Sequence, residues 1–149
     1  MGKTRGFTLI ELMVTIVVFA IIAMMAAPSF SNMQTEQNLN LSTQELIGTF
    51  NAARSKAVTE RRQGMTVHLN SVNTGTKAEN SSMQLNWQPS GKAVLSSSVT
   101  QIQFNLNGGV IGATTDTSFK ICDTAGGSKS KTISISPIGV IQPTVEGTC

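Results

Sequence analysis

The chain has 149 residues, a formal net charge of +3, 13% charged residues and 5% aromatic residues. This length allows one small domain beside an apolar N-terminal segment, and the charge is too small to indicate nucleic-acid binding by itself. A single His and the absence of Tyr leave few side chains for catalysis. The many Ser, Thr, Asn and Gly residues are typical of a β-rich, extracytoplasmic surface.

The first predicted element is an apolar helix over residues 7–27. At 1.5 Å per residue this helix would be about 31 Å long, close to the thickness of the hydrocarbon core of a bilayer. Lys3 and Arg5 precede the segment and no charge follows it directly, so the positive-inside rule predicts a cytoplasmic N-terminus and an external domain. A secretory signal peptide cleaved around Ala26 and Ala27 is the alternative that this pattern leaves open.

Glu11 interrupts the apolar segment. A carboxylate inside a spanning helix costs on the order of 3 kcal/mol, which indicates a function and a partner. Cleavage between Gly6 and Phe7 would create an α-ammonium one helical turn from Glu11, as a counter-charge within one chain or between neighbouring chains. An unpaired acid at the membrane interface is the alternative, and the short Glu side chain disfavours it.

A second apolar stripe follows a polar stretch and has helical spacing. Its members are Leu39, Leu46, Ile47, Phe50, Ala53, Ala57 and Val58. Pro28 is expected to kink a helix that otherwise continues, because proline removes one backbone hydrogen bond. Gly64 is expected to end the helix, with Arg61 and Arg62 near its C-terminus. The prediction is one long helix over residues 8–62.

From Met65 the hydrophobic period changes to two, which indicates strands separated by turns. The predicted strands are residues 65–69, 83–87, 99–106, 119–122 and 131–136. Pro137 and Gly139 are placed in the turn of a final hairpin, and Pro143 restricts its last strand to a sheet edge. A helix packed on antiparallel sheet predicts an α+β fold.

Cys122 and Cys149 are the two cysteines. Outside the cytoplasm, a disulfide between them would pin the end of the chain and contribute roughly 3–4 kcal/mol. Two unpaired thiols are the alternative. Without nearby His residues the pair falls short of a four-ligand metal site, so neither a metal nor a cofactor is expected.

The segment "GFTLIE", residues 6–11, resembles the class III signal of type IV pilins and type II secretion pseudopilins. The short basic leader before it and the position of Pro28 after it are also similar to that signal. The resemblance implies that residues 1–6 are a leader peptide and that residues 7–27 are the transmembrane half of the first helix. It also implies that residues 28–149 form a periplasmic pilin-like domain, which includes the second half of that helix.

The same resemblance assigns roles to single residues. It implies cleavage by prepilin peptidase after Gly6, N-methylation of Phe7, assembly through Glu11 and a helix bend at Pro28. The product would be a filament whose core is a bundle of these helices. The expected location is the bacterial inner membrane, crossed once, and then the filament.

Three further segments are similar to H-type minor pseudopilins and their minor-pilin relatives. They are residues 53–57, 104–109 and 131–141. This resemblance implies a minor pilin in the complex that primes a type IV pilus near its tip, with roles in motility and adhesion. The alternatives are an H-type minor pseudopilin of a type II secretion system and a DNA-binding minor pilin for natural transformation. The implied partners are minor and major pilins, prepilin peptidase, the inner-membrane assembly platform and membrane lipid.

Six basic residues could contact DNA phosphates. They are Arg54, Lys56, Arg61, Arg62, Lys129 and Lys131. Glu60 lies among the first four, and a solvated helix end explains that cluster equally well. DNA-binding relatives carry a Gly-Arg-any-Arg motif in the closing hairpin, whereas the matching residues 139–142 read "GVIQ" and lack both arginines. Nucleic acid is therefore not an expected partner.

No catalytic residue is expected. On a predicted strand, His68 shares one face with the polar residues Thr66 and Asn70, so it is expected to face solvent. The spacing of Asp116 and Asp123 matches no triad, and the chain has neither a phosphate-binding loop nor a paired-carboxylate motif. We expect a substrate of prepilin peptidase and N-methyltransferase rather than an enzyme.

Overall fold

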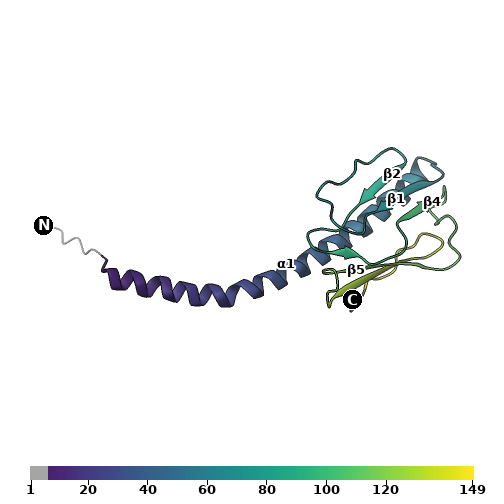
Figure 1. Cartoon of the computed structure of the whole chain (residues 1–149). Helices are drawn as coiled ribbons and strands as arrows, with labels where there is room; N and C mark the ends of the chain where they lie inside the picture. The colour runs from purple at the N-terminus through teal and green to yellow at the C-terminus, as the bar shows by residue number, and fades with distance from the viewer. Residues whose placement is uncertain (1–6) are drawn as a thin grey trace. The chain divides into compact units, whose positions relative to one another are not determined.

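The computed structural model describes residues 7–149, apart from the side chains of residues 26–29. The predicted leader, residues 1–6 with Gly6, lies outside this description. One helix, α1 (Leu9–Thr59), is followed by strands β1 to β7 (Figure 1). The chain divides into two compact units, and the second unit runs from Thr35 to Cys149.

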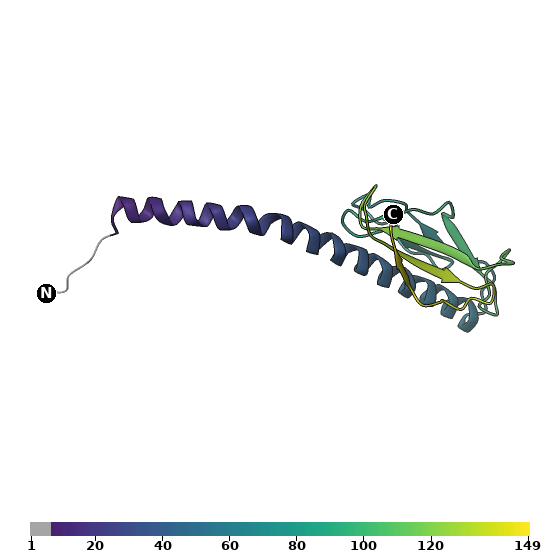
Figure 2. The ribbon, with the colours of Figure 1, turned by 90° about the horizontal axis from the view of Figure 1, so that it is seen from below.

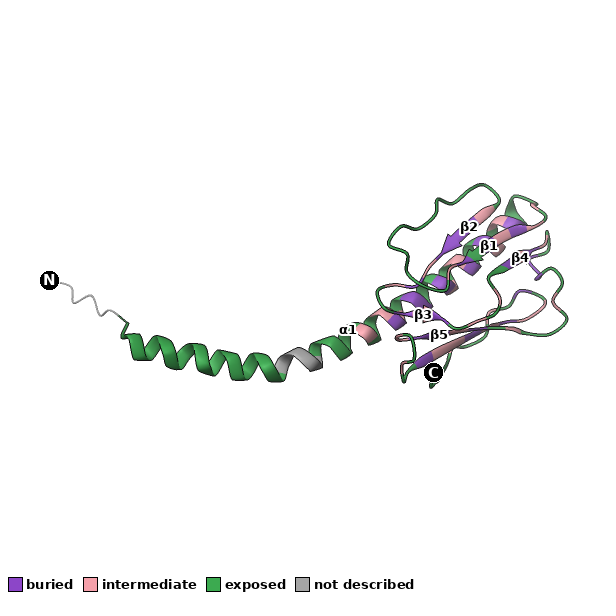
Figure 3. Cartoon of the chain, in the orientation of Figure 1, coloured by how far each residue is buried: buried purple, intermediate pink, exposed green. Residues whose placement is uncertain are grey.

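The first unit contains the N-terminal part of α1. The large apolar side chains described between Phe7 and Met25 are exposed (Figure 3). A window of 18 residues in α1 has a mean hydropathy of 2.7, and none of its residues is buried. By length and composition, this helix could cross a membrane. The helix continues through Pro28. The side chain of Pro28 lies outside the described residues, and the kink stays a prediction.

The C-terminal end of α1 differs from the prediction. The helix ends at Thr59, and Arg61 has a positive φ of 49°. The Arg62 N–H donates to the Ala57 carbonyl at 2.9 Å and the Arg61 N–H to the Val58 carbonyl at 3.4 Å. These two bonds form a Schellman motif with Arg61 in the left-handed position. The prediction that Gly64 ends the helix is therefore wrong, because the motif is completed before the chain reaches that glycine.

Two sheets lie alongside the C-terminal part of α1 (Figures 1 and 2). The three-stranded sheet has the order β2-β1-β4, and the four-stranded sheet has the order β3-β5-β6-β7. The first sheet consists of β1 (Met65–Leu69), β2 (Gln84–Trp87) and β4 (Gln101–Phe104). The second sheet consists of β3 (Val94–Leu95), β5 (Thr117–Cys122), β6 (Ser130–Ile135) and β7 (Val145–Gly147).

The α+β class is confirmed, with three differences in detail. The predicted last hairpin strand before Pro143 is only an isolated bridge between Ile135 and Ile141, and the last strand, β7, follows that proline. The pair β1–β2 is parallel, with Thr66 opposite Gln84, whereas the other strand pairs are antiparallel. The connection over residues 70–83 is long enough to return the chain to the same end of the sheet, which a short hairpin cannot do. The two-residue strand β3 was missed, because so short a segment shows no alternation.

The core lies between the second half of α1 and the sheets. Of the predicted helical stripe, five side chains are buried: Leu39, Leu46, Phe50, Ala53 and Ala57. The rings of Phe50 and Phe119, from α1 and β5, lie 5.0 Å apart between centroids. Ile47 is partly buried. Val58 is 44% exposed, so its place in the stripe is wrong.

Two turns from different sheets meet beside the helix end. The Val110 N–H donates to the Pro137 carbonyl at 2.8 Å, which joins the two turns. Within the turn after β4, the Asn105 N–H donates to the Gly109 carbonyl at 2.8 Å. Gly139 lies in the turn after β6, as predicted, with a φ of 79°. The turn after β4 and the turn after β6 are therefore bonded to each other through their backbones.

Candidate functional site

The start of α1 is the first candidate site. Phe7 is 79% exposed, and Glu11 lies in the first turn, where the helix dipole favours an acid. Thr8 Oγ1 accepts a hydrogen bond from the Glu11 backbone N–H at 3.3 Å. This bond satisfies one of the amides that a helix start leaves unpaired. The helix therefore begins directly after the predicted cleavage site, and its capped first turn includes Glu11.

The role of Thr8 was not predicted, although the sequence carries the signal. Thr8 and Glu11 stand three residues apart just before an apolar run, which is the pattern of a capping box. Within residues 7–25, Glu11 is the only charged residue. Its carboxylate lies on an exposed helix surface that is otherwise mostly apolar.

The six basic residues do not form one uniformly positive surface. Lys129 Nζ lies 2.6 Å from Glu36 Oε2, and Lys131 Nζ lies 3.2 Å from Glu146 Oε1. The hydrogen bond from Lys129 and its positive charge lower the pKa of Glu36, and Glu36 in turn raises the pKa of Lys129. Both lysines are thus neutralised by acids that come from other elements.

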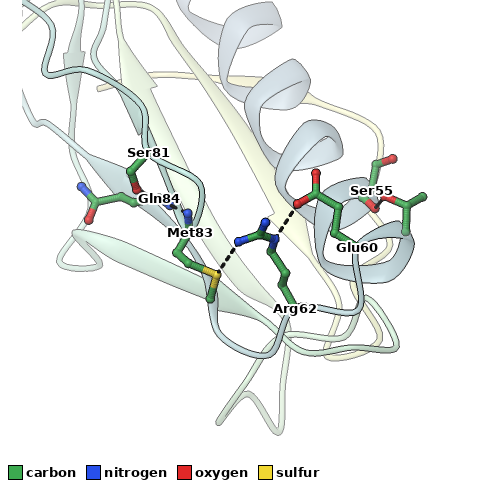
Figure 4. Close-up of polar contacts among 7 residues, drawn as sticks. Ser55, Glu60, Arg62, Ser81, Met83 and Gln84 are labelled. Carbon is green, nitrogen blue, oxygen red and sulfur yellow. Dashed lines mark hydrogen bonds and ion pairs between the residues drawn. The ribbon is translucent and has the colours of Figure 1, made fainter.

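Arg62 is also paired. Figure 4 shows its guanidinium between Glu60 and Met83, with Nε 2.5 Å from Glu60 Oε2 and Nη1 3.5 Å from Met83 Sδ. Arg54 comes earlier on α1 and lies against the two bonded turns, since a Cβ added to Gly108 would lie 2.9 Å from the Nε of Arg54. Lys56 is half-buried and Arg61 is exposed.

The closing hairpin is apolar where the DNA-binding relatives carry arginines. Val140 is 45% exposed, and Ile141 packs against the core. The Gln142 amide donates to Asp116 Oδ2 at 2.5 Å. The two positions that would carry arginine are therefore an apolar side chain and an amide that already has a partner.

A disulfide joins Cys122 and Cys149, whose Cα atoms lie 5.9 Å apart. Cys122 is buried at the end of β5, whereas Cys149 is the exposed last residue. The β7 strand between them on the chain has three exposed residues. The bridge therefore ties down a terminal strand that buries little of its own surface.

The other candidates stay at the surface. His68 is exposed, in agreement with the alternation of β1. Within residues 7–149, no group of three or more His, Cys, Asp or Glu side chains is placed to hold a metal ion. Asp116 and Asp123 bond to Gln142 and to the Thr124 N–H respectively.

Comparisons with known proteins identify two family models, one that matches the N-terminal segment and one that matches most of the domain. A family model described as the prokaryotic N-terminal methylation motif matches residues 1–27. A second, described as type II transport protein GspH, matches residues 42–139, which include the C-terminal part of α1 and the strands from β1 to β6. No curated protein and no solved structure is significantly similar to the chain.

Proposed function

The chain belongs to the family of the type II transport protein GspH and carries the prokaryotic N-terminal methylation motif. Among the functions open to this family, we propose that it primes a type IV pilus as a minor pilin. More generally, the chain is a minor pilin or pseudopilin, and such proteins are structural subunits rather than enzymes. Its apolar N-terminal helix and its class III signal indicate an inner-membrane-anchored pilin. The priming role near the pilus tip is the proposed step beyond this.

The observation that carries the role of filament subunit, which both the pilin and the pseudopilin share, is the start of α1. Leu9 begins the helix two residues after the mature N-terminus that cleavage after Gly6 would create. The exposed apolar surface that follows suits lipid at first and neighbouring helices later. A capped first turn that includes the single acid of this segment supports an ordered helix end, at which a charge can be matched.

The proposed mechanism uses this acid as a register. Before assembly the apolar helix anchors the chain in the inner membrane, with its N-terminus in the cytoplasm and its domain in the periplasm. Cleavage by prepilin peptidase exposes the Phe7 α-ammonium, which N-methylation leaves positively charged. Glu11 of one subunit neutralises the Phe7 ammonium of the next, because an unpaired carboxylate in a low-dielectric bundle is costly. Only one axial offset of the two helices satisfies both charges.

The Cys122–Cys149 bridge supports the pilus as the setting. A retracting pilus is under traction, and the bridge pins the exposed terminal strand of the domain. The description of the matched family favours a second candidate, the H-type minor pseudopilin of a type II secretion system. Both candidates use the same helix and the same domain.

One experiment separates these two settings. The gene is deleted in its own host and restored on a plasmid, and surface pili, twitching motility and secretion of an extracellular enzyme are measured. The proposal expects loss of pili and twitching with normal secretion. Loss of secretion with normal pili would replace it with the pseudopilin function, and loss of neither would contradict both.

The ion pairs of the basic residues argue against the third candidate function, a DNA-binding minor pilin. Lys129, Lys131 and Arg62 are each paired with an acid, which weakens their attraction for phosphate. Gel-shift measurements on the full chain in detergent, at near-physiological salt, test the candidate. A salt-dependent shift at low micromolar protein would revive it.

A further inference from the structure

Strand β4 is at the edge of the three-stranded sheet, and its outer side is only partly covered. The carbonyls of Thr100 and Phe104 accept hydrogen bonds from the β1 side at 2.8 and 3.1 Å. Along an antiparallel strand, residues bonded to one neighbour alternate with residues whose backbone groups face the other way. Gln101 and Gln103 therefore turn their backbone N–H and C=O groups to the outer edge.

The outer edge is closed at its two ends and open between them. The Gln103 carbonyl accepts the Ile111 N–H at 2.8 Å, and the Val99 N–H donates to Ser97 Oγ at 3.2 Å. In the part of the chain that the structure describes, the N–H and C=O of Gln101 and the N–H of Gln103 have no partner on this side. An unpaired edge of this kind is a template for strand addition.

A groove of about 270 Å³ borders this open edge. Its apolar lining is formed by Val99, Ile102, Val110, Ile111 and Ala113, and no lining residue carries a charge. Ile111 is 39% exposed, so its side chain is accessible from solvent. A charged side chain that entered the groove would lose water without meeting a counter-charge. The groove therefore suits an uncharged partner.

The other outer edges, within residues 7–149, are covered or charged. On β2 the Asn86 N–H donates to Asn80 Oδ1 at 2.7 Å, and on β3 the Leu95 N–H donates to the Ser71 carbonyl at 2.8 Å. The β7 edge is three residues long and carries Glu146 at its centre. Short length and charged side chains are the usual protection of an edge against pairing. Among the described edges, β4 combines an open backbone with an uncharged surface.

We propose that the outer edge of β4 is a docking site for an extended, uncharged segment of a partner protein. The segment adds as one strand beside Gln101, exchanges backbone hydrogen bonds with its N–H and C=O, and accepts from the Gln103 N–H. One apolar side chain of the segment fills the groove beside Ile111. This inference rests on the edge and the groove alone, so it does not depend on which filament the chain joins.

The test uses the full chain, labelled with ¹⁵N in detergent micelles, and two blocked hexapeptides as probes. One probe is Thr-Val-Thr-Val-Thr-Val, and the matched charged probe has Lys in place of each Thr. With the uncharged probe, the Gln101 and Gln103 amides are expected to shift and to exchange more slowly, with a dissociation constant on the order of 1 mM or below. The dissociation constant of the charged probe is expected to be higher by a factor of about ten or more.

Two variants and one control identify the site. Gln101→Pro removes the outward N–H without removing a bond to β1, as proline does at an exposed strand edge, and it is expected to abolish the response. Gln101→Ala keeps the N–H and is expected to bind like the wild type. Ile111→Lys puts a charge into the groove without changing the β4 backbone, and it is expected to weaken binding even if the proline variant fails to fold.

Three results would overturn the proposal. The first is an equal response of the wild type and a folded Gln101→Pro variant. The second is no change at either Gln amide up to about 10 mM probe. The third is protection of these amides without probe that disappears on dilution, since the occupant would then be a second copy of this chain.

Discussion

Gly139 passes so close to Gly108 that a Cβ built on Gly139 would collide with the Gly108 carbonyl oxygen. Gly139 also has a φ of 79°, which L side chains rarely adopt. We therefore expect Gly139→Ala to destabilise the domain by two separate costs. Gly112→Ala is the matched control, because Gly112 has a φ of 78° and nothing within 4 Å of its added Cβ.

The control isolates the backbone cost, about 1–2 kcal/mol for a non-glycine residue in the left-handed region. The collision should lower the free energy of unfolding of Gly139→Ala by a further amount of about 1–3 kcal/mol. Denaturant unfolding of the full chain in detergent measures both, with Trp87 as the probe because it is the single tryptophan and is 1% exposed. Equal losses in the two variants would show that the two turns separate without cost.

Arg61 offers the opposite change. It holds the left-handed position of the Schellman motif that ends α1, with a φ of 49°. Arg61→Gly should relieve this strain and raise the free energy of unfolding by about 1 kcal/mol, part of the gain being offset by the greater entropy of the unfolded chain. Arg61→Ala removes the same charge and keeps the strain, so it should give no comparable gain in the same unfolding experiment.

Glu11→Ala tests the register of the filament. We expect cleavage and membrane insertion to be unchanged, whereas incorporation and piliation fall, because the Phe7 ammonium loses its counter-charge. Glu11→Gln should show the same loss, since it keeps the size of the side chain and removes its charge. Immunoblots of sheared filaments and of the membrane fraction measure the effect, and normal assembly of either variant would refute the register.

Thr8→Val separates the helix cap from the charge. It removes the hydroxyl that accepts the Glu11 N–H and should cost the helix start about 1 kcal/mol. Assembly should be reduced much less than in Glu11→Ala, because the acid and the ammonium both remain. An equal defect in the two variants would assign the effect to helix order rather than to charge.

Cys149→Ser removes the bridge without leaving a cavity, since Cys149 is exposed. The bridge closes a loop with a sequence separation of 27, for which chain entropy predicts a loss of roughly 3–4 kcal/mol. Hydrogen exchange should rise first in β7, whose side chains are exposed. Reduced wild-type protein should match the variant in the same unfolding experiment, and a wild type that is insensitive to reduction would contradict this role.

The ion pair between Glu36 and Lys129 should make stability depend on pH at both extremes. The folded state lowers the pKa of Glu36 below 4.5 and raises the pKa of Lys129 above 10.5. Its contribution is therefore full between these two values. It disappears as pH falls through the lowered pKa of Glu36, and as pH rises through the raised pKa of Lys129.

Unfolding measured from acid to alkaline pH checks this pattern. The difference between the wild type and Glu36→Gln should be constant near neutral pH and should vanish in acid. Glu45→Gln, an exposed change on the same helix, should track the wild type. A difference that stays constant into strong acid would show that the pair contributes nothing.

Local patterns determined the elements of this protein and most of its core. The apolar run over residues 7–27, the acid at Glu11 and the stripe from Leu39 to Ala57 depend on side-chain type and on the helical period, which a sequence displays directly. The alternation of β1 placed His68 at the surface for the same reason. A resemblance at residues 6–11 indicated the prepilin family, and the two family matches agree with it.

Only the tertiary structure decided which elements meet. Spacing gave no reason for β2 to run parallel to β1, for Lys129 to reach Glu36, or for Arg61 rather than Gly64 to end the helix. The open edge beside Gln101 likewise depends on which strands pair and where Ile111 leaves the sheet. These relations join residues far apart in the chain or depend on competing local bonds, and their energies are set by packing, which a periodic pattern does not contain.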